Sequence, residues 1–121
     1  MRHSNQREIV YQVVCESCDH PNVEAILTRA KEKMPSINIA TVYRNLAVLV
    51  EQNKIRRLAL TTGDRFDKTL YPHSHFYCRK CECVTDVDSM YVNDMVTNIE
   101  SENFQIERTD IMFTGICPKC K

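Results

Sequence analysis

The sequence predicts an α+β protein with two parts, an N-terminal winged helix-turn-helix and a small C-terminal α/β part. Apolar residues recur at helical spacing in three early segments, separated by the proline-containing stretches HPN and MPSIN. Two strand-like segments, KIRRLAL and RFDKTLY, then flank the turn TTGD and predict a hairpin. The remainder reads as strand, strand, helix, strand. We therefore expect two domains, residues 1–70 and 71–121, with the linker near residues 71–73.

The first helix is expected from Asn5 to Ser17, with Ser4 as its N-cap. Asn22 is expected to cap the second helix, and Asn38 the third, IATVYRNLAVLVEQ. The residues expected to face inward are Ile9, Val10, Val13 and Val14, then Val23, Ile26, Leu27 and Ala30, then Val42, Leu46, Leu49 and Val50.

In the second part, the segments HFYC and CVTDVD flank a tight connection, RKCE. A helix is expected from Met90 to Glu102, and FQIERTDIMFTGIC alternates well enough to be a strand. The apolar stripe of this helix is Val92, Met95, Val96 and Ile99. A part this small buries little surface, so it needs a metal ion, a partner chain, or both.

The composition is that of an ordinary globular protein, with 43% apolar and 26% charged residues. No apolar run is long enough to span a membrane, and no N-terminal segment suggests secretion, which predicts a cytoplasmic protein. Seven cysteines in a small cytoplasmic chain indicate metal or redox chemistry rather than structural disulfides.

The net charge of zero hides an asymmetry along the chain. Residues 1–63 carry nine Lys/Arg and six Asp/Glu, a net of +3, whereas residues 64–121 carry seven and ten, a net of −3. The basic first half permits contact with a polyanion, although ordinary solvated charge explains such a split equally well.

Two CxxC pairs, Cys78/Cys81 and Cys117/Cys120, are separated by 35 residues. Each pair sits where a strand meets a turn, so four thiolates can surround one ion in a closed tetrahedral zinc site. A closed site leaves no position for a substrate, and its function is therefore structural. Disulfides, a redox pair and an iron–sulfur cluster are the alternatives.

Three further cysteines need separate interpretations. Cys15 and Cys18 form a third CxxC, either a core thiol with a loop residue or a redox pair close to His20. Cys83 is expected to pack within a strand.

His73 and His75 lie two residues apart on an extended segment, which points both imidazoles to one side. They are either metal ligands or hydrogen-bonded surface residues. If His20, Asp67 and Asp86 join them, nitrogen and carboxylate donors form a site suited to iron(II) or manganese(II), and less suited to copper or structural zinc.

The motifs NQREIV, HPN, INIATVYRNLAVLVE, RFD, HSHFYCRKC, VTD and GICPKC, in this order and spacing, resemble the ferric uptake regulator family over nearly the whole chain. The resemblance implies a winged-helix DNA-binding domain followed by a dimerisation domain. It implies a metal-dependent transcriptional repressor, active as a homodimer on double-stranded operator DNA, and not an enzyme.

Carried over residue by residue, the resemblance assigns structural Zn²⁺ to Cys78, Cys81, Cys117 and Cys120. It assigns regulatory Fe²⁺ or Mn²⁺ to His20, Asp67, His73, His75 and Asp86. Asp67 stands where the iron-sensing branch usually has glutamate and the peroxide-sensing branch has aspartate. The chain therefore looks like a hydrogen peroxide sensor that acts through oxidation of a ligand histidine, with an iron- or manganese-responsive repressor without peroxide sensing as the alternative.

The chain departs from the family pattern in three places. Members usually have a further helix ahead of the first one predicted here. The last strand lacks the histidine of the family's additional metal site, and Cys15 and Cys18 are not among the family's usual cysteines.

In this interpretation the third helix enters the major groove. Arg44 is expected to contact guanine and Asn45 adenine, while Thr41 and Tyr43 contact phosphate or a thymine methyl. The full expected DNA-contact set is Ala40, Thr41, Tyr43, Arg44 and Asn45 on the helix, with Lys54, Arg56, Arg57 and Arg65 on or near the wing. Helix packing by Tyr43 and solvated charge on the wing are the alternatives.

Two other classes of protein remain as alternatives. One is a small iron metalloenzyme that uses the histidine and carboxylate set. The other is a zinc-stabilised protein–protein adaptor that binds no nucleic acid.

Overall fold

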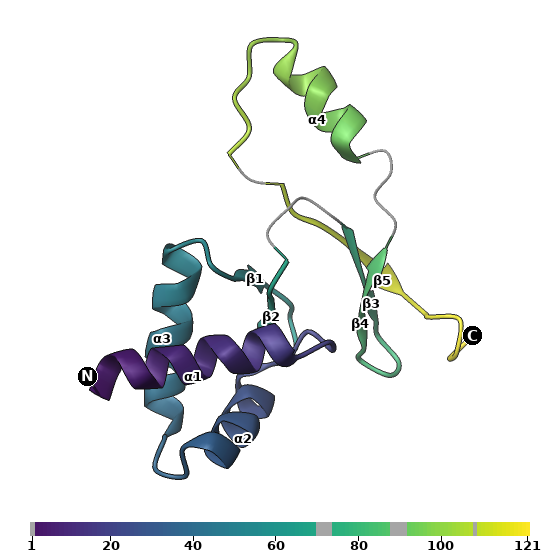
Figure 1. The fold of residues 1–121 in the computed structure, drawn as a ribbon. Helices are drawn as coiled ribbons and strands as arrows, with labels where there is room; N and C mark the ends of the chain where they lie inside the picture. Colours follow the sequence, from purple (N-terminus) through teal and green to yellow (C-terminus); the bar gives the residue numbers. More distant parts are fainter. Residues whose placement is uncertain (1, 70–73, 88–91, 108) are drawn as a thin grey trace. The chain divides into compact units, whose positions relative to one another are not determined.

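The computed structural model describes residues 2–69, 74–87, 92–107 and 109–121, and for residues 2–4 the backbone alone. The chain divides into two compact units, which we call the N-terminal unit (residues 1–70) and the C-terminal unit (residues 71–121) (Figure 1). Helices and a short hairpin in the first unit, and a small sheet with a helix in the second, confirm the α+β class. Among the described residues, no helix combines the length and the apolar character that a membrane crossing requires.

Three helices form most of the N-terminal unit, and they pack on one another (Figure 1). They are α1 (Arg2–Glu16), α2 (Val23–Lys33) and α3 (Ile39–Glu51). The start of α1 differs from the prediction: the helix begins before Asn5, so Ser4 is not its N-cap. Neither glycine nor proline occurs among residues 2–4, and each residue added to an existing helix gains a backbone hydrogen bond.

The two other predicted caps are confirmed. The Asn22 side-chain oxygen accepts from the Ala25 N–H at 2.8 Å, and the Asn38 oxygen accepts from the Thr41 N–H at 2.9 Å. Both cap residues have extended backbone conformations, as N-caps require. Pro35 follows the C-cap of α2 and excludes a helical conformation at the residue before it.

The core of the N-terminal unit is built from the inward faces of these helices, as the apolar spacing predicts. Ile9, Leu27 and Val50 are only partly buried at its edge. The buried residues are Val10, Val13, Val14, Val23, Ile26, Ala30, Ile37, Val42, Leu46, Leu49, Ile55 and Phe66.

The predicted hairpin is present and shorter than expected, with β1 (Arg56–Leu58) antiparallel to β2 (Arg65–Asp67). Gly63, with φ +121°, lies in the turn between the strands, where a side chain would be strained. Phe66 is buried in the helical core, and its N–H donates to the Pro21 oxygen at 3.0 Å. The hairpin is therefore tied to the loop that follows α1.

The C-terminal unit contains a three-stranded sheet in the order β4-β3-β5. Its strands are β3 (Ser74–Cys78), β4 (Val84–Val87) and β5 (Ile111–Gly115), and its helix is α4 (Val92–Glu100). The pair β3–β4 is antiparallel and the pair β3–β5 is parallel. A parallel pair needs a long crossover connection, and α4 lies in it.

Three expectations for this unit need correction. Cys83 is exposed and precedes β4, so it does not pack within the strand. The last strand occupies only part of the predicted segment, and α4 ends two residues before Glu102, while its predicted start lies outside the described residues. On α4, Val92 is buried, whereas Met95 and Ile99 are 52% and 45% exposed.

Replacing Asn38 with alanine removes the acceptor for an N–H at the start of α3. We expect the free energy of unfolding to fall by about 1 kcal/mol, measured by urea denaturation. Asn38→Asp keeps an acceptor and serves as the control, with little change expected. Equal stability of the two variants would contradict the proposed importance of this cap.

Candidate metal centres and nucleic-acid interface

Four cysteine thiols gather at one end of the sheet in the C-terminal unit. Cys78 ends β3 and pairs in register with Gly115, which ends β5. Because the two strands are parallel, the turns that follow them lie at the same edge of the sheet. The turn after β3 carries Cys81, and the turn after β5 carries Cys117 and Cys120.

The spacing of these sulfur atoms fits a zinc ion. All four lie within 4.8 Å of one another, and the Cys81 and Cys117 sulfurs are 3.8 Å apart. Zinc–sulfur bonds of about 2.3 Å in a tetrahedron give sulfur–sulfur edges of about 3.8 Å. A disulfide needs about 2.05 Å, so the 3.8 Å distance is that of two ligands of one ion rather than of a covalent bond.

The electrostatics of the cluster also favour a cation. The backbone N–H groups of Cys81 and Cys117 each lie 3.4 Å from the Cys78 sulfur. Their hydrogen bonds lower the pKa of Cys78 to about 6. The neighbouring thiols, Cys117 first and then Cys81, raise the pKa of Cys120 to about 12. Four thiolates this close require a positive ion to offset their repulsion, and a divalent zinc supplies it.

In the N-terminal unit, His20 and Asp67 form a buried pair, with His20 Nε2 3.7 Å from Asp67 Oδ2. Their side chains are 7% and 6% exposed. His20 lies in the loop after α1, and its carbonyl oxygen accepts from Arg65 Nη1 at 3.3 Å. The Asp67 carboxylate also accepts from the Thr69 N–H at 3.0 Å. Strand β2 thus brings both the carboxylate and the loop contact to the histidine.

The C-terminal unit contains a second pair of the same chemistry. His75 on β3 and Asp86 on β4 are directly opposite in the antiparallel register. His75 Nε2 lies 3.3 Å from Asp86 Oδ1, with the histidine 2% and the aspartate 55% exposed. His73, the fifth predicted ligand, lies outside the described residues. Within the described part of the chain, each unit therefore offers one imidazole–carboxylate pair, and these are donor types that iron(II) and manganese(II) accept.

The outer face of α3 presents part of the predicted reading surface. Ala40 and Arg44 are exposed, and Tyr43 is 56% exposed. Ile39, which is not among the predicted DNA contacts, is 44% exposed beside them. An exposed Tyr43 does not support the alternative that it is a core packing residue.

Two predicted DNA contacts need correction, because Thr41 and Asn45 face inward, at 5% and 3% exposure. Asn45 Nδ2 donates to the backbone carbonyl oxygen of Thr41 at 2.9 Å, and Asn45 Oδ1 accepts from Arg7 Nε at 3.3 Å. Both ends of the amide are occupied inside the unit, so Asn45 holds α3 against α1 instead of presenting its amide to a base. Thr41, one turn earlier on the same face, is buried with it.

The basic residues of the wing have different surroundings. Lys54 and Arg57 are exposed, with the Lys54 ammonium 5.7 Å from the Tyr11 ring centroid and Arg57 Nε 3.5 Å from Asp64. Arg56 and Arg65 are half-buried. Arg65 therefore has a structural contact, to the His20 backbone, that its prediction as a phosphate-binding residue did not include. Forty-five positions separate the two residues, so no sequence spacing signals that contact.

Comparison with known proteins gives one consistent result. The model of the ferric uptake regulator family matches residues 1–114. A ferric uptake regulation protein of Bacillus subtilis is 32% identical over 95% of this chain and 82% of its own length. A peroxide-responsive repressor of Staphylococcus epidermidis is 27% identical over 100% and 82%. The solved Helicobacter pylori ferric uptake regulator, described as having three functional metal binding sites, superposes with a TM-score of 0.80 at 25% identity, over 96% of this chain and 79% of that one.

Replacing Cys117 with serine tests the zinc assignment. We expect zinc content to fall from about one ion per chain to near zero and the melting temperature to drop, because structural zinc contributes directly to folding. Elemental analysis and calorimetry measure the two quantities. Cys83→Ser, which changes an exposed cysteine outside the cluster, is the control and should keep its zinc. Full zinc content in the Cys117 variant would refute the assignment.

Proposed function

The chain belongs to the ferric uptake regulator family of metal-responsive transcriptional regulators, and on this premise we propose that it represses transcription as a metal-dependent homodimer on operator DNA. The observation that carries the proposal is that one compact unit contains both an exposed reading face on α3 and the buried His20–Asp67 pair. Two of the proposed metal ligands and the proposed DNA-reading helix thus belong to the same compact unit.

We propose that α3 reads the major groove through Arg44 and Tyr43, with Ala40 close to the bases. The exposure of these three side chains supports the assignment. Lys54 and Arg57 supply contacts to phosphate that weaken as salt rises. Arg56 and Arg65 remain proposed contacts to the DNA backbone, since part of each side chain is accessible.

The proposed regulatory ion is Fe²⁺ or Mn²⁺. Its proposed ligands are His20, Asp67, His73, His75 and Asp86. Support comes from the donor chemistry of the His20–Asp67 and His75–Asp86 pairs, which are carboxylate-rich and free of thiolate. Because the set draws residues from both units, a bound ion would restrict the hinge between them, and its loss would weaken operator binding.

Members of the family are dimeric, and we propose that this chain pairs through its C-terminal unit. Among its described residues, the large apolar side chains that this unit exposes are Met95, Ile99, Phe104 and Phe113. Exposed apolar residues that gather on one small unit are typical of an interface between subunits. Two copies would then present two reading helices to successive turns of the duplex.

Peroxide sensing is the finer part of the proposal, and it rests on Asp67 in the RFD motif. Bound ferrous iron supplies the chemistry that activates hydrogen peroxide. One oxygen atom of the peroxide enters an imidazole C–H bond of His20 or His73, and water leaves. The oxidised ring is a poorer metal ligand, and repression ends. The alternative is an iron- or manganese-responsive repressor without this oxidation.

Replacing Arg44 with alanine tests the reading helix. We expect at least ~5-fold weaker binding to the duplex that the wild type selects from a random pool, because a bidentate arginine–guanine contact is worth about 1–3 kcal/mol. Fluorescence anisotropy at fixed salt, with manganese or with a chelator, gives the dissociation constants. Lys31→Ala, an exposed cation on α2, is the matched control. Unchanged affinity in the Arg44 variant would mean that another surface reads the DNA.

Peroxide treatment separates the two sensing alternatives. We expect mass spectrometry of the iron-loaded protein, after dilute hydrogen peroxide, to find one added oxygen on the peptide that contains His20 or His73, together with loss of DNA binding. The manganese-loaded protein should remain unmodified under the same conditions. Intact histidines with retained DNA binding would establish the plain metal sensor.

A further inference from the structure

We propose that Arg29 on α2 is a positioning residue for the regulatory metal ion, because it holds through Asp19 the loop that presents His20. This inference rests on the proposed function, in which His20 is a ligand. Arg29 was not selected from the sequence, where nothing about its spacing distinguishes it.

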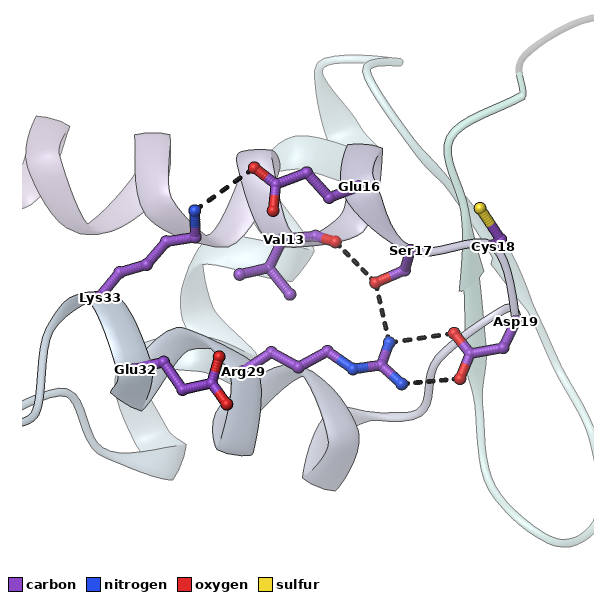
Figure 2. A pocket seen from close by; sticks show the side chains of 8 residues that line it. All are labelled: Val13, Glu16, Ser17, Cys18, Asp19, Arg29, Glu32 and Lys33. Carbon is purple, nitrogen blue, oxygen red and sulfur yellow. Dashed lines mark hydrogen bonds and ion pairs between the residues drawn. The ribbon is translucent and has the colours of Figure 1, made fainter.

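Figure 2 shows the Arg29 guanidinium reaching from α2 to the loop after α1. Its two terminal nitrogens donate to the two Asp19 oxygens at 2.9 and 2.7 Å. One of them also donates to the Ser17 hydroxyl at 2.8 Å, and that hydroxyl donates to the Val13 oxygen at 2.6 Å. The network therefore joins α2, the loop and the last turn of α1.

The loop needs such support because His20 has φ +51°, a left-handed conformation that costs a residue with a side chain about 1–3 kcal/mol. Such a conformation persists only where its neighbours fix it from both directions. After His20, the Phe66 N–H bonds to the Pro21 oxygen at 3.0 Å. Before His20, the contact with Arg29 holds Asp19, the residue next to it, against α2. Without Arg29, Asp19 loses this contact, and the nearest earlier contacts are those of Ser17 to the last turn of α1.

The chemistry of the pair suits positioning better than stabilisation. Arg29 and Asp19 form an ion pair, with 2.7 Å between Arg29 Nη2 and Asp19 Oδ2. The side chains are nevertheless 38% and 58% exposed, and exposed ion pairs contribute only about 0–1 kcal/mol to stability. A bidentate arginine–carboxylate contact has a fixed geometry. It therefore fixes the position of the backbone that leads into His20.

The same contact also occupies a carboxylate that directly precedes His20 in the chain. With both oxygens bonded to Arg29, Asp19 is kept as a support of the loop rather than as an additional metal ligand. Removing a group that hydrogen-bonds directly to a metal ligand typically changes metal affinity 10- to 100-fold, and a support that acts through the residue next to the ligand is expected to have a smaller effect.

The surroundings of Arg29 provide a matched control. Arg29 lines a pocket of about 420 Å³ between the end of α1 and α2. On the same pocket wall, Lys33 Nζ lies 3.3 Å from the Glu16 carboxylate and joins α2 to α1 (Figure 2). The Lys33–Glu16 pair thus crosses the same two helices and does not include the loop before His20.

The test uses the full-length, zinc-loaded protein and measures manganese affinity by electron paramagnetic resonance titration. We expect Arg29→Ala and Asp19→Ala each to weaken Mn²⁺ binding about 3- to 5-fold, within the range that an exposed ion pair can contribute. The double variant should be no weaker than either single variant, because both changes remove one interaction. Lys33→Ala should bind Mn²⁺ as the wild type does. Zinc content and melting temperature should stay close to wild type in all four proteins.

Unchanged or tighter Mn²⁺ binding by Arg29→Ala overturns the inference, and so does an equal loss in Lys33→Ala, which would indicate a general effect of helix packing. His20→Ala provides the reference for the function itself. If His20→Ala binds Mn²⁺ normally, His20 is not a ligand, and both the proposed site and the inference fail. If His20→Ala loses binding and Arg29→Ala does not, only the inference fails.

Discussion

The parallel pairing of β3 with β5 is the interaction on which the C-terminal unit depends. It brings together two CxxC turns that are far apart in the sequence, because Cys78 and Gly115 end neighbouring strands in register. The resulting cluster of four sulfurs has the dimensions of a zinc tetrahedron. A unit of this size, with large apolar side chains still exposed, gains from the metal what a larger core would otherwise provide.

In the N-terminal unit, by contrast, the helices themselves enclose an apolar core. Its specific feature is the division of α3 into two faces. Leu46 and Leu49 pack inward, and Asn45 completes that inner face by bonding to Arg7, while Tyr43 and Arg44 stay outside. Because the inner face is fixed over the whole length of the helix, the outer face has a defined orientation. This rigidity is what a helix needs if it is to read a groove.

Local features of this fold could be predicted from sequence, and features that depend on distant partners could not. The caps at Asn22 and Asn38 depend on the next three residues, and both predictions are correct. Asn45 was expected to contact adenine because it lies on the predicted reading helix, yet its side chain is bonded inward to Arg7, 38 positions away. The four-cysteine cluster was predictable because thiols in two CxxC turns have few other uses, although the parallel strand pairing behind it was not predicted.

The His75–Asp86 pair is unequal in its access to water, with a carboxylate that is 55% exposed beside an imidazole that is 2% exposed. In the proposed site, a hydrated divalent cation that approaches from solvent would meet a negatively charged oxygen first, and the carboxylate could replace one of its waters before any nitrogen is reached. Capture and dehydration are thereby divided between two side chains. If the pair ligates the proposed ion, the rate of its acquisition would depend on the aspartate, and the time of its retention would depend on the histidine.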